Sequence, residues 1–148
     1  MKIDPHSYAE GFIAEDEVAL AARARGIELG APDSSQGAGS FLQFLAGVLK
    51  AQSVVEIGTG SGVGALWVLG GMMQAGTLTS IDDELEHTSI ARTALNESGV
   101  SPQRYRLITN PVMDVMTKLT ERAYDLVVYR HNPEDLQDAI VEAHRILR

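Results

Sequence analysis

A glycine-rich segment near the middle of the chain constrains the fold more than any other feature. The apolar, largely β-branched run at residues 53–57 is typical of a buried strand. Glycines then recur at every second position from 58 to 64, and an apolar segment dense enough for a buried helix follows. Because glycine lacks a Cβ atom, such a backbone can adopt positive φ angles and approach a ligand closely. A strand, a glycine-rich turn and a helix in that order predict a nucleotide-type binding loop.

Two classes of ligand compete for this loop. The dinucleotide fingerprint G-x-G-x-x-G/A fails from Gly58 and matches only formally from Gly60, where it ends on Ala65. Glu56 argues against a dinucleotide, because its carboxylate would face a pyrophosphate. S-adenosylmethionine instead carries a cationic amine and a sulfonium, which a carboxylate attracts. We therefore favour S-adenosylmethionine. A structural turn without a ligand stays open as the next alternative, followed by dinucleotide binding.

Length, charge and cysteine content narrow the classes of function. The 148 residues suffice for one domain, which we expect to comprise an N-terminal arm, helix and loop over residues 1–39 and a core over residues 40–148. A formal net charge of −8 disfavours nucleic acid and anionic membranes as partners. The absence of cysteine excludes disulfides and thiolate catalysis and fits a reducing, cytoplasmic location.

Hydrophobic periodicity predicts alternating helices and strands. Before the central segment we expect a loose arm over 1–13, a helix over 15–24, a loop over 29–39, and a helix that begins at Ser40 with Phe41 and Phe44 in a core-facing stripe. After it, strands are predicted over 77–81, 104–109 and 125–129, and helices over 85–98, about 112–119 and 134–147. This alternation predicts a doubly wound, mainly parallel α/β sheet with its ligand site at the carboxyl ends of the strands.

Three further groups of residues follow the predicted strands. Asp82 is placed to accept the ribose hydroxyls of a nucleoside, and helix capping explains it equally well when it is taken alone. When Glu56 and the glycines are considered as well, ribose binding is the favoured interpretation of Asp82. Residues 110–114 would border an adenine ring or form the first turn of a packed helix. His131, after the fourth strand, is a candidate general base.

From Ser34 onward the sequence resembles the class I S-adenosylmethionine-dependent O-methyltransferases of the catechol and caffeoyl-CoA type, in particular small actinobacterial members. The resemblance is carried by residues 55–62, 66–67, 76–82, 91–92 and 124–127. It implies a Rossmann-like methyltransferase fold, S-adenosylmethionine as cofactor, a small-molecule methyl acceptor and a homodimer. The residues that it implies for cofactor binding are Ser34, Glu56, Gly58, Thr59, Gly64 and Asp82.

The sequence departs from this family in two places. The fourth strand of the family typically ends in Asp-Ala-Asp, whose first Asp binds a metal, whereas Arg130, His131 and Asn132 stand here. An arginine repels a divalent cation, so we expect no metal site. The sequence also ends where the family continues with a glycine turn and a fifth strand. We therefore expect an incomplete sheet whose open fourth strand invites self-association.

Three hypotheses about function remain at this stage. The first is an O-methyltransferase that acts on a small molecule without the family's metal. The second is a catalytically inactive methyltransferase-like protein that serves in binding or interaction. The third is a dinucleotide-binding oxidoreductase. No residue of a substrate wall is identifiable, so the methyl acceptor is not predicted.

Overall fold

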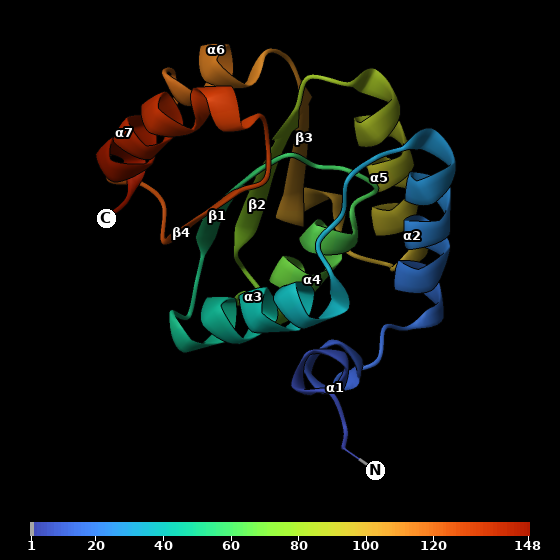
Figure 1. Cartoon of the computed structure of the whole chain (residues 1–148). Coiled ribbons are helices and arrows are strands. Elements are labelled where there is room, and N and C mark those ends of the chain that lie inside the picture. The colour runs from blue at the N-terminus through green and yellow to red at the C-terminus, as the bar shows by residue number, and fades with distance from the viewer. Residues whose placement is uncertain (1) are drawn as a thin grey trace.

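The computed structural model describes residues 2–148 and shows one sheet with helices on both faces (Figure 1). Its strands are β1 (Ser53–Ile57), β2 (Thr77–Asp82), β3 (Tyr105–Thr109) and β4 (Leu126–Tyr129). All pairings are parallel, and the strand order is β3-β2-β1-β4. The prediction of a doubly wound, mainly parallel α/β fold is confirmed. Because β1 lies between β2 and β4, the glycine-rich loop leaves the centre of the sheet.

Helices cover the sheet in two layers. One face carries α3 (Gln36–Val48), α4 (Val63–Gly71) and α5 (Leu85–Glu97), and the other carries α6 (Val112–Met116) and α7 (Leu136–Ile146). Helix α2 (Glu17–Leu29) packs on α5, and α1 (Pro5–Gly11) packs on α3. None of the helices within residues 2–148 has the length and apolar character needed to cross a membrane.

The buried residues of the sheet divide into two clusters because successive side chains of a strand point to opposite faces. Val54 and Leu78 belong to the cluster under α3, α4 and α5, whereas Val55, Ile57 and Ile81 belong to the cluster under α6 and α7. All five side chains are fully buried. Burial on both faces fits the apolar residues of β1 and β2, as in other buried parallel strands, but both strands also bury polar side chains, such as Glu56 and Ser80.

The N-terminal region is more regular than the sequence suggested. The expected loose arm contains α1, which begins after Asp4, whose carboxylate accepts the Ser7 N–H at 3.0 Å. Helix α3 begins inside the expected loop, because its N-cap is Ser35, which accepts the Ala38 N–H at 3.2 Å. The prediction of Ser40 as N-cap is wrong. Two capping residues lie five positions apart, and periodicity alone did not separate them.

The predicted core stripe of α3 is wrong for its two phenylalanines, although Leu42 of the same helix does pack against the core. Phe41 and Phe44 are 58% and 62% exposed and stack on each other with ring centroids 6.4 Å apart. The helix instead packs on α4 through the small residues Gly39 and Ala46, which are buried. At Gly39 there is room only for hydrogen, because a Cβ atom would overlap the indole ring of Trp67. Small residues let the two helices approach closely and turn the bulky ones outward.

This packing predicts the effect of a single methyl group. Gly39→Ala should lower the free energy of unfolding by about 1–3 kcal/mol, because overpacking forces the indole or the helix to move. Gly11→Ala is the matched control, since no atom lies within 4 Å of a Cβ atom there. Urea unfolding measures both variants. Equal stability of the Gly39 variant and the wild type would contradict the described packing.

Candidate functional site

The glycine-rich loop joins the end of β1 to the start of α4. Gly58, Gly60 and Gly62 have φ angles of 89°, 55° and 92°, a region that side chains disfavour. Space is restricted as well, because a Cβ atom would overlap the backbone carbonyl of Arg130 at Gly58 and that of Pro32 at Gly60. The loop therefore needs glycine for its conformation and for two close approaches of other backbone segments.

Glu56 lies at the carboxyl end of β1 with its side chain completely buried. Its Oε1 accepts a hydrogen bond from Ser80 Oγ at 2.7 Å, and Ser80 stands directly opposite it on β2. The Ser80 hydroxyl also pairs with Thr59 Oγ1 at 2.8 Å. Burial raises the pKa of Glu56, while the nearby charge of Arg130 and the Ser80 hydrogen bond oppose that rise.

Arg130 supplies the positive charge at this buried carboxylate. It follows β4, and its Nη2 donates to Glu56 Oε2 at 3.4 Å and to the Gly58 carbonyl oxygen at 2.8 Å. The pair lies against the first turn of α4, because a Cβ atom on Gly64 would come within 2.5 Å of Glu56 Oε2 and 2.9 Å of Arg130 Nη2. One guanidinium nitrogen thus joins the ends of β1 and β4.

Asp82 ends β2 and connects two elements. Its Oδ2 accepts the Gly60 N–H at 3.1 Å, which holds the loop. Its Oδ1 accepts the Glu84 N–H at 3.0 Å and lies 3.1 Å from His87 Nδ1 at the start of α5. Asp82 as a whole is 3% exposed. An ionised carboxylate offers about four acceptor positions, so one remains for a further donor.

A segment that precedes α3 covers the loop from the other side. The Asp33 carboxylate accepts the Ser61 N–H at 3.1 Å and the Ser61 hydroxyl at 2.7 Å. The neighbouring Ser34 is buried, and its hydroxyl has no hydrogen-bond partner. A buried polar group without a partner is unusual in a folded protein and calls for an explanation.

The structure brings most of the expected site residues together. One connected group contains Glu56, Gly58, Thr59, Gly64 and Asp82, and Ser34 lies in the covering segment. His131 stands apart from this group, with Nε2 3.5 Å from Asp83 Oδ2 and its ring edge-on to Tyr129. Residues 110 and 111 precede α6, and its first turn holds Val112, which belongs to the core, and Asp114, which is exposed.

Sequence reasoning missed the partners of these residues. It read Arg130 only as a departure from a metal-binding pattern, and it did not single out Asp33, Ser80 or His87. A signal for Arg130 was present, since a buried carboxylate requires a compensating charge and parallel strands end at the same edge of a sheet. The strand register that brings Ser80 opposite Glu56 is not readable from one sequence.

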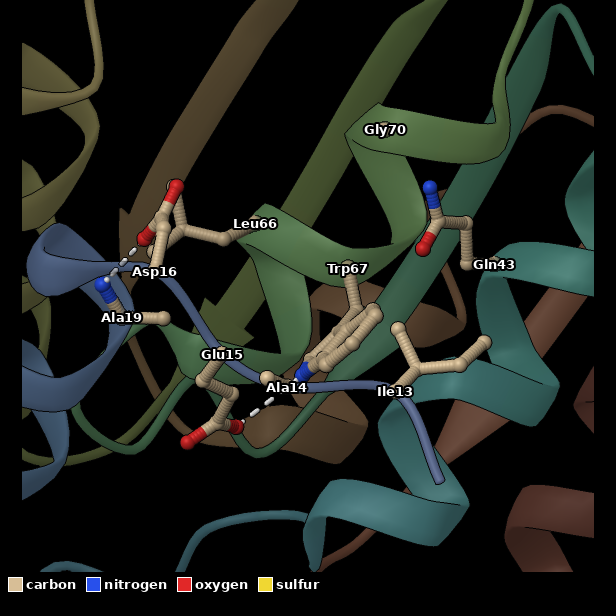
Figure 2. A pocket seen from close by; sticks show the side chains of 9 residues that line it. All are labelled: Ile13, Ala14, Glu15, Asp16, Ala19, Gln43, Leu66, Trp67 and Gly70. Carbon is tan, nitrogen blue, oxygen red and sulfur yellow. Dashed lines mark hydrogen bonds between the residues drawn. The ribbon is translucent and has the colours of Figure 1, made fainter. Parts of the chain in front are cut away.

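A separate pocket lies along α4 (Figure 2). It has a volume of about 310 Å³ and lies between residues 13–19, α3 and α4. In it the indole Nε1 of Trp67 donates to Glu15 Oε1 at 3.1 Å. None of the residues expected to bind a cofactor lines this pocket. Over residues 2–148, no group of three or more His, Asp or Glu side chains is arranged to hold a metal ion.

Comparison with known proteins assigns the family. A family model described as O-methyltransferase matches residues 7–131. The chain belongs to the O-methyltransferase family. A relative from Mycobacterium sp. (strain KMS) is named as an O-methyltransferase. It is 44% identical over 142 residues, which cover 96% of this chain and 64% of the relative. The chain thus spans less than two thirds of the length of this curated relative.

Solved structures share the architecture of this chain. Cofactor-bound Rv0187 from MTB is 27% identical, with a TM-score of 0.88 over 100% of this chain and 70% of its own. TomG from Streptomyces achromogenes, an O-methyltransferase solved in complex with SAM, has a TM-score of 0.88 over 97% of this chain and 66% of its own. At 24% identity, TomG shows the common fold. The matches give no support to a dinucleotide-binding oxidoreductase.

The burial of Glu56 predicts a pH-dependent stability. The pKa of Glu56 is raised in the folded chain. Its contribution to the free energy of unfolding is therefore fully present below the ordinary glutamate pKa of the unfolded state, and it is lost as pH rises through the raised value. Glu56→Gln cannot ionise and escapes this loss. Relative to wild type, the variant should therefore gain unfolding free energy between about pH 4 and about pH 7.5, by about 1.4 kcal/mol for each unit of pKa difference.

Urea unfolding at the two pH values measures this gain. Glu86→Gln on the exposed side of α5 is the control, because it makes the same change outside the core. Parallel stability profiles of the wild type and the Glu56 variant would contradict the described burial.

Proposed function

We propose that the chain is an S-adenosylmethionine-dependent O-methyltransferase domain, a single unit over residues 1–148, that acts on a small-molecule acceptor. One observation carries the proposal. At the carboxyl end of the central strand, Glu56 Oε2 and the Gly58 carbonyl oxygen both accept a hydrogen bond from one cationic nitrogen, Arg130 Nη2. Such a pair of acceptors fits an α-ammonium group. Membership of the O-methyltransferase family and the SAM complex of TomG support the same cofactor.

The other polar groups of the site fit the remaining parts of this cofactor. Asp82 keeps one acceptor position for a ribose hydroxyl. The hydroxyl of Ser34 lacks a partner and suits a carboxylate. Helix α4 begins at Val63 after its N-cap Gly62 and has no side-chain cap, so its first N–H groups suit an anion as well. Thr59 contributes indirectly, since its hydroxyl holds Ser80 against Glu56.

Catalysis would rest mainly on positioning. When bound, S-adenosylmethionine supplies an electrophilic methyl group on its sulfonium. The chain's part is to hold the ligand at the strand ends and to present an acceptor oxygen in line. His131, beside Asp83, is our candidate for taking the acceptor's proton. Arg130 stands where the family's metal ligand is expected, so we assign no metal to this step.

Calorimetric titration with S-adenosylhomocysteine tests the cofactor class, with NAD as the comparison ligand. Asp82→Ala should weaken binding about 10- to 100-fold, because a hydrogen bond to a charged group contributes about 1.5–3 kcal/mol. Asp83→Ala is the matched control, since this neighbouring carboxylate is exposed. Binding of NAD but not of S-adenosylhomocysteine would overturn the proposal. An unchanged affinity of the Asp82 variant for S-adenosylhomocysteine would overturn the assignment of Asp82 to the ribose. Binding without turnover of any acceptor would favour the inactive alternative.

We further propose a cytoplasmic homodimer that forms through β4. This strand lies at the edge of the sheet beside β1, and residues 126, 127 and 129 are half-buried and apolar or aromatic. Exposed strand edges pair readily with another chain. Val127→Lys should shift the species toward monomer in analytical ultracentrifugation. Phe44→Glu, which changes the separate aromatic surface of α3, should leave the dimer intact. A monomeric wild type, or a dimer broken only by the Phe44 variant, would contradict this assignment.

A further inference from the structure

Arg130 occupies the position that the proposed function gives to the cofactor's amine. Its Nη2 is the nitrogen on which Glu56 Oε2 and the Gly58 carbonyl oxygen converge, at 3.4 and 2.8 Å. The two acceptors are close together, and the first turn of α4 closes the space beside them, since a Cβ atom on Gly64 would lie 2.9 Å from Nη2. The position where the two acceptors converge is therefore already taken by one cationic nitrogen.

The guanidinium is held loosely in this position. Its Nε is buried and has no hydrogen-bond partner, and Nη1 reaches the Pro32 carbonyl oxygen only at 3.5 Å. The bond to Glu56 is long for a charge-assisted hydrogen bond, which is typically about 2.7–2.9 Å. The side chain is 20% exposed, so a path to solvent exists. Arg130 can therefore be displaced, but only by a ligand group that replaces its charge at Glu56.

We propose that Arg130 competes with the α-amine of the ligand and sets the ligand specificity of this site. The inference rests on the proposed function and deepens it. With Arg130 in place, the nucleoside subsite at Asp82 is available while the amine subsite is filled. The site then accepts adenine thioether nucleosides that lack the amino-acid tail, such as 5′-methylthioadenosine, at least as well as S-adenosylhomocysteine. Binding of the tail requires the guanidinium to leave, which weakens the affinity.

Calorimetry with the two ligands tests this competition. Wild type should bind 5′-methylthioadenosine at least as tightly as S-adenosylhomocysteine. Arg130→Gln removes the charge and keeps a polar, shorter side chain. It should tighten S-adenosylhomocysteine about tenfold or more, a change of about 1.4 kcal/mol per factor of ten. The affinity for 5′-methylthioadenosine should stay within about twofold, because this ligand has no amine. Arg106→Gln, an exposed arginine on β3, is the matched control and should alter neither affinity.

The outcomes separate this inference from the proposed function. An unchanged or weaker affinity of Arg130→Gln for S-adenosylhomocysteine would overturn the competition, and would show that the guanidinium is neutral toward the tail or helps to bind it. If the variant does not fold, wild type alone decides, since a preference of more than about tenfold for S-adenosylhomocysteine excludes a filled amine subsite. Failure of both ligands to bind wild type and a folded Arg130 variant would overturn the proposed function, and the inference with it.

Discussion

A carboxylate buried at the end of the central strand is the constraint on which the site depends. Glu56 is withdrawn from water, and a charge in that position is tolerated only with hydrogen bonds and a compensating charge. Ser80 supplies the hydrogen bond from β2, and Arg130 supplies the charge from the end of β4. The glycines at 58 and 64 leave room for Arg130 and for the Glu56 carboxylate. Three strands, the loop and the first turn of α4 are thus positioned by one side chain.

The sequence predicted the parts of the molecule that local pattern determines. Hydrophobic periodicity predicted the strands and the glycines predicted the turn after β1, so the α/β architecture was readable from the sequence. What could not be read depends on contacts between distant residues. The outward orientation of Phe41 and Phe44 follows from the close packing of Gly39 on Trp67. The pairing of Arg130 with Glu56 likewise depends on the register of β4 beside β1.

Family membership and local geometry contribute different information. Membership establishes the fold, and it directs attention to the carboxyl ends of the strands. It does not describe the contacts of the arginine that follows β4. In this chain that side chain turns back into the site and pairs with Glu56. Arg130 thereby bears on two expectations at once, because it stands where the resemblance implies a metal ligand and it fills the proposed subsite for the cofactor's amine.

A crystal structure of the chain with S-adenosylhomocysteine would test the central claim most directly. The account predicts that the ligand's amine lies within hydrogen-bonding distance of Glu56 and of the Gly58 carbonyl oxygen, that its ribose contacts Asp82, and that the Arg130 guanidinium has moved away from both acceptors. A ligand bound elsewhere, for example in the pocket beside Trp67, would contradict the assignment of the site. A ligand at the strand ends with Arg130 still paired to Glu56 would contradict the role given to the arginine.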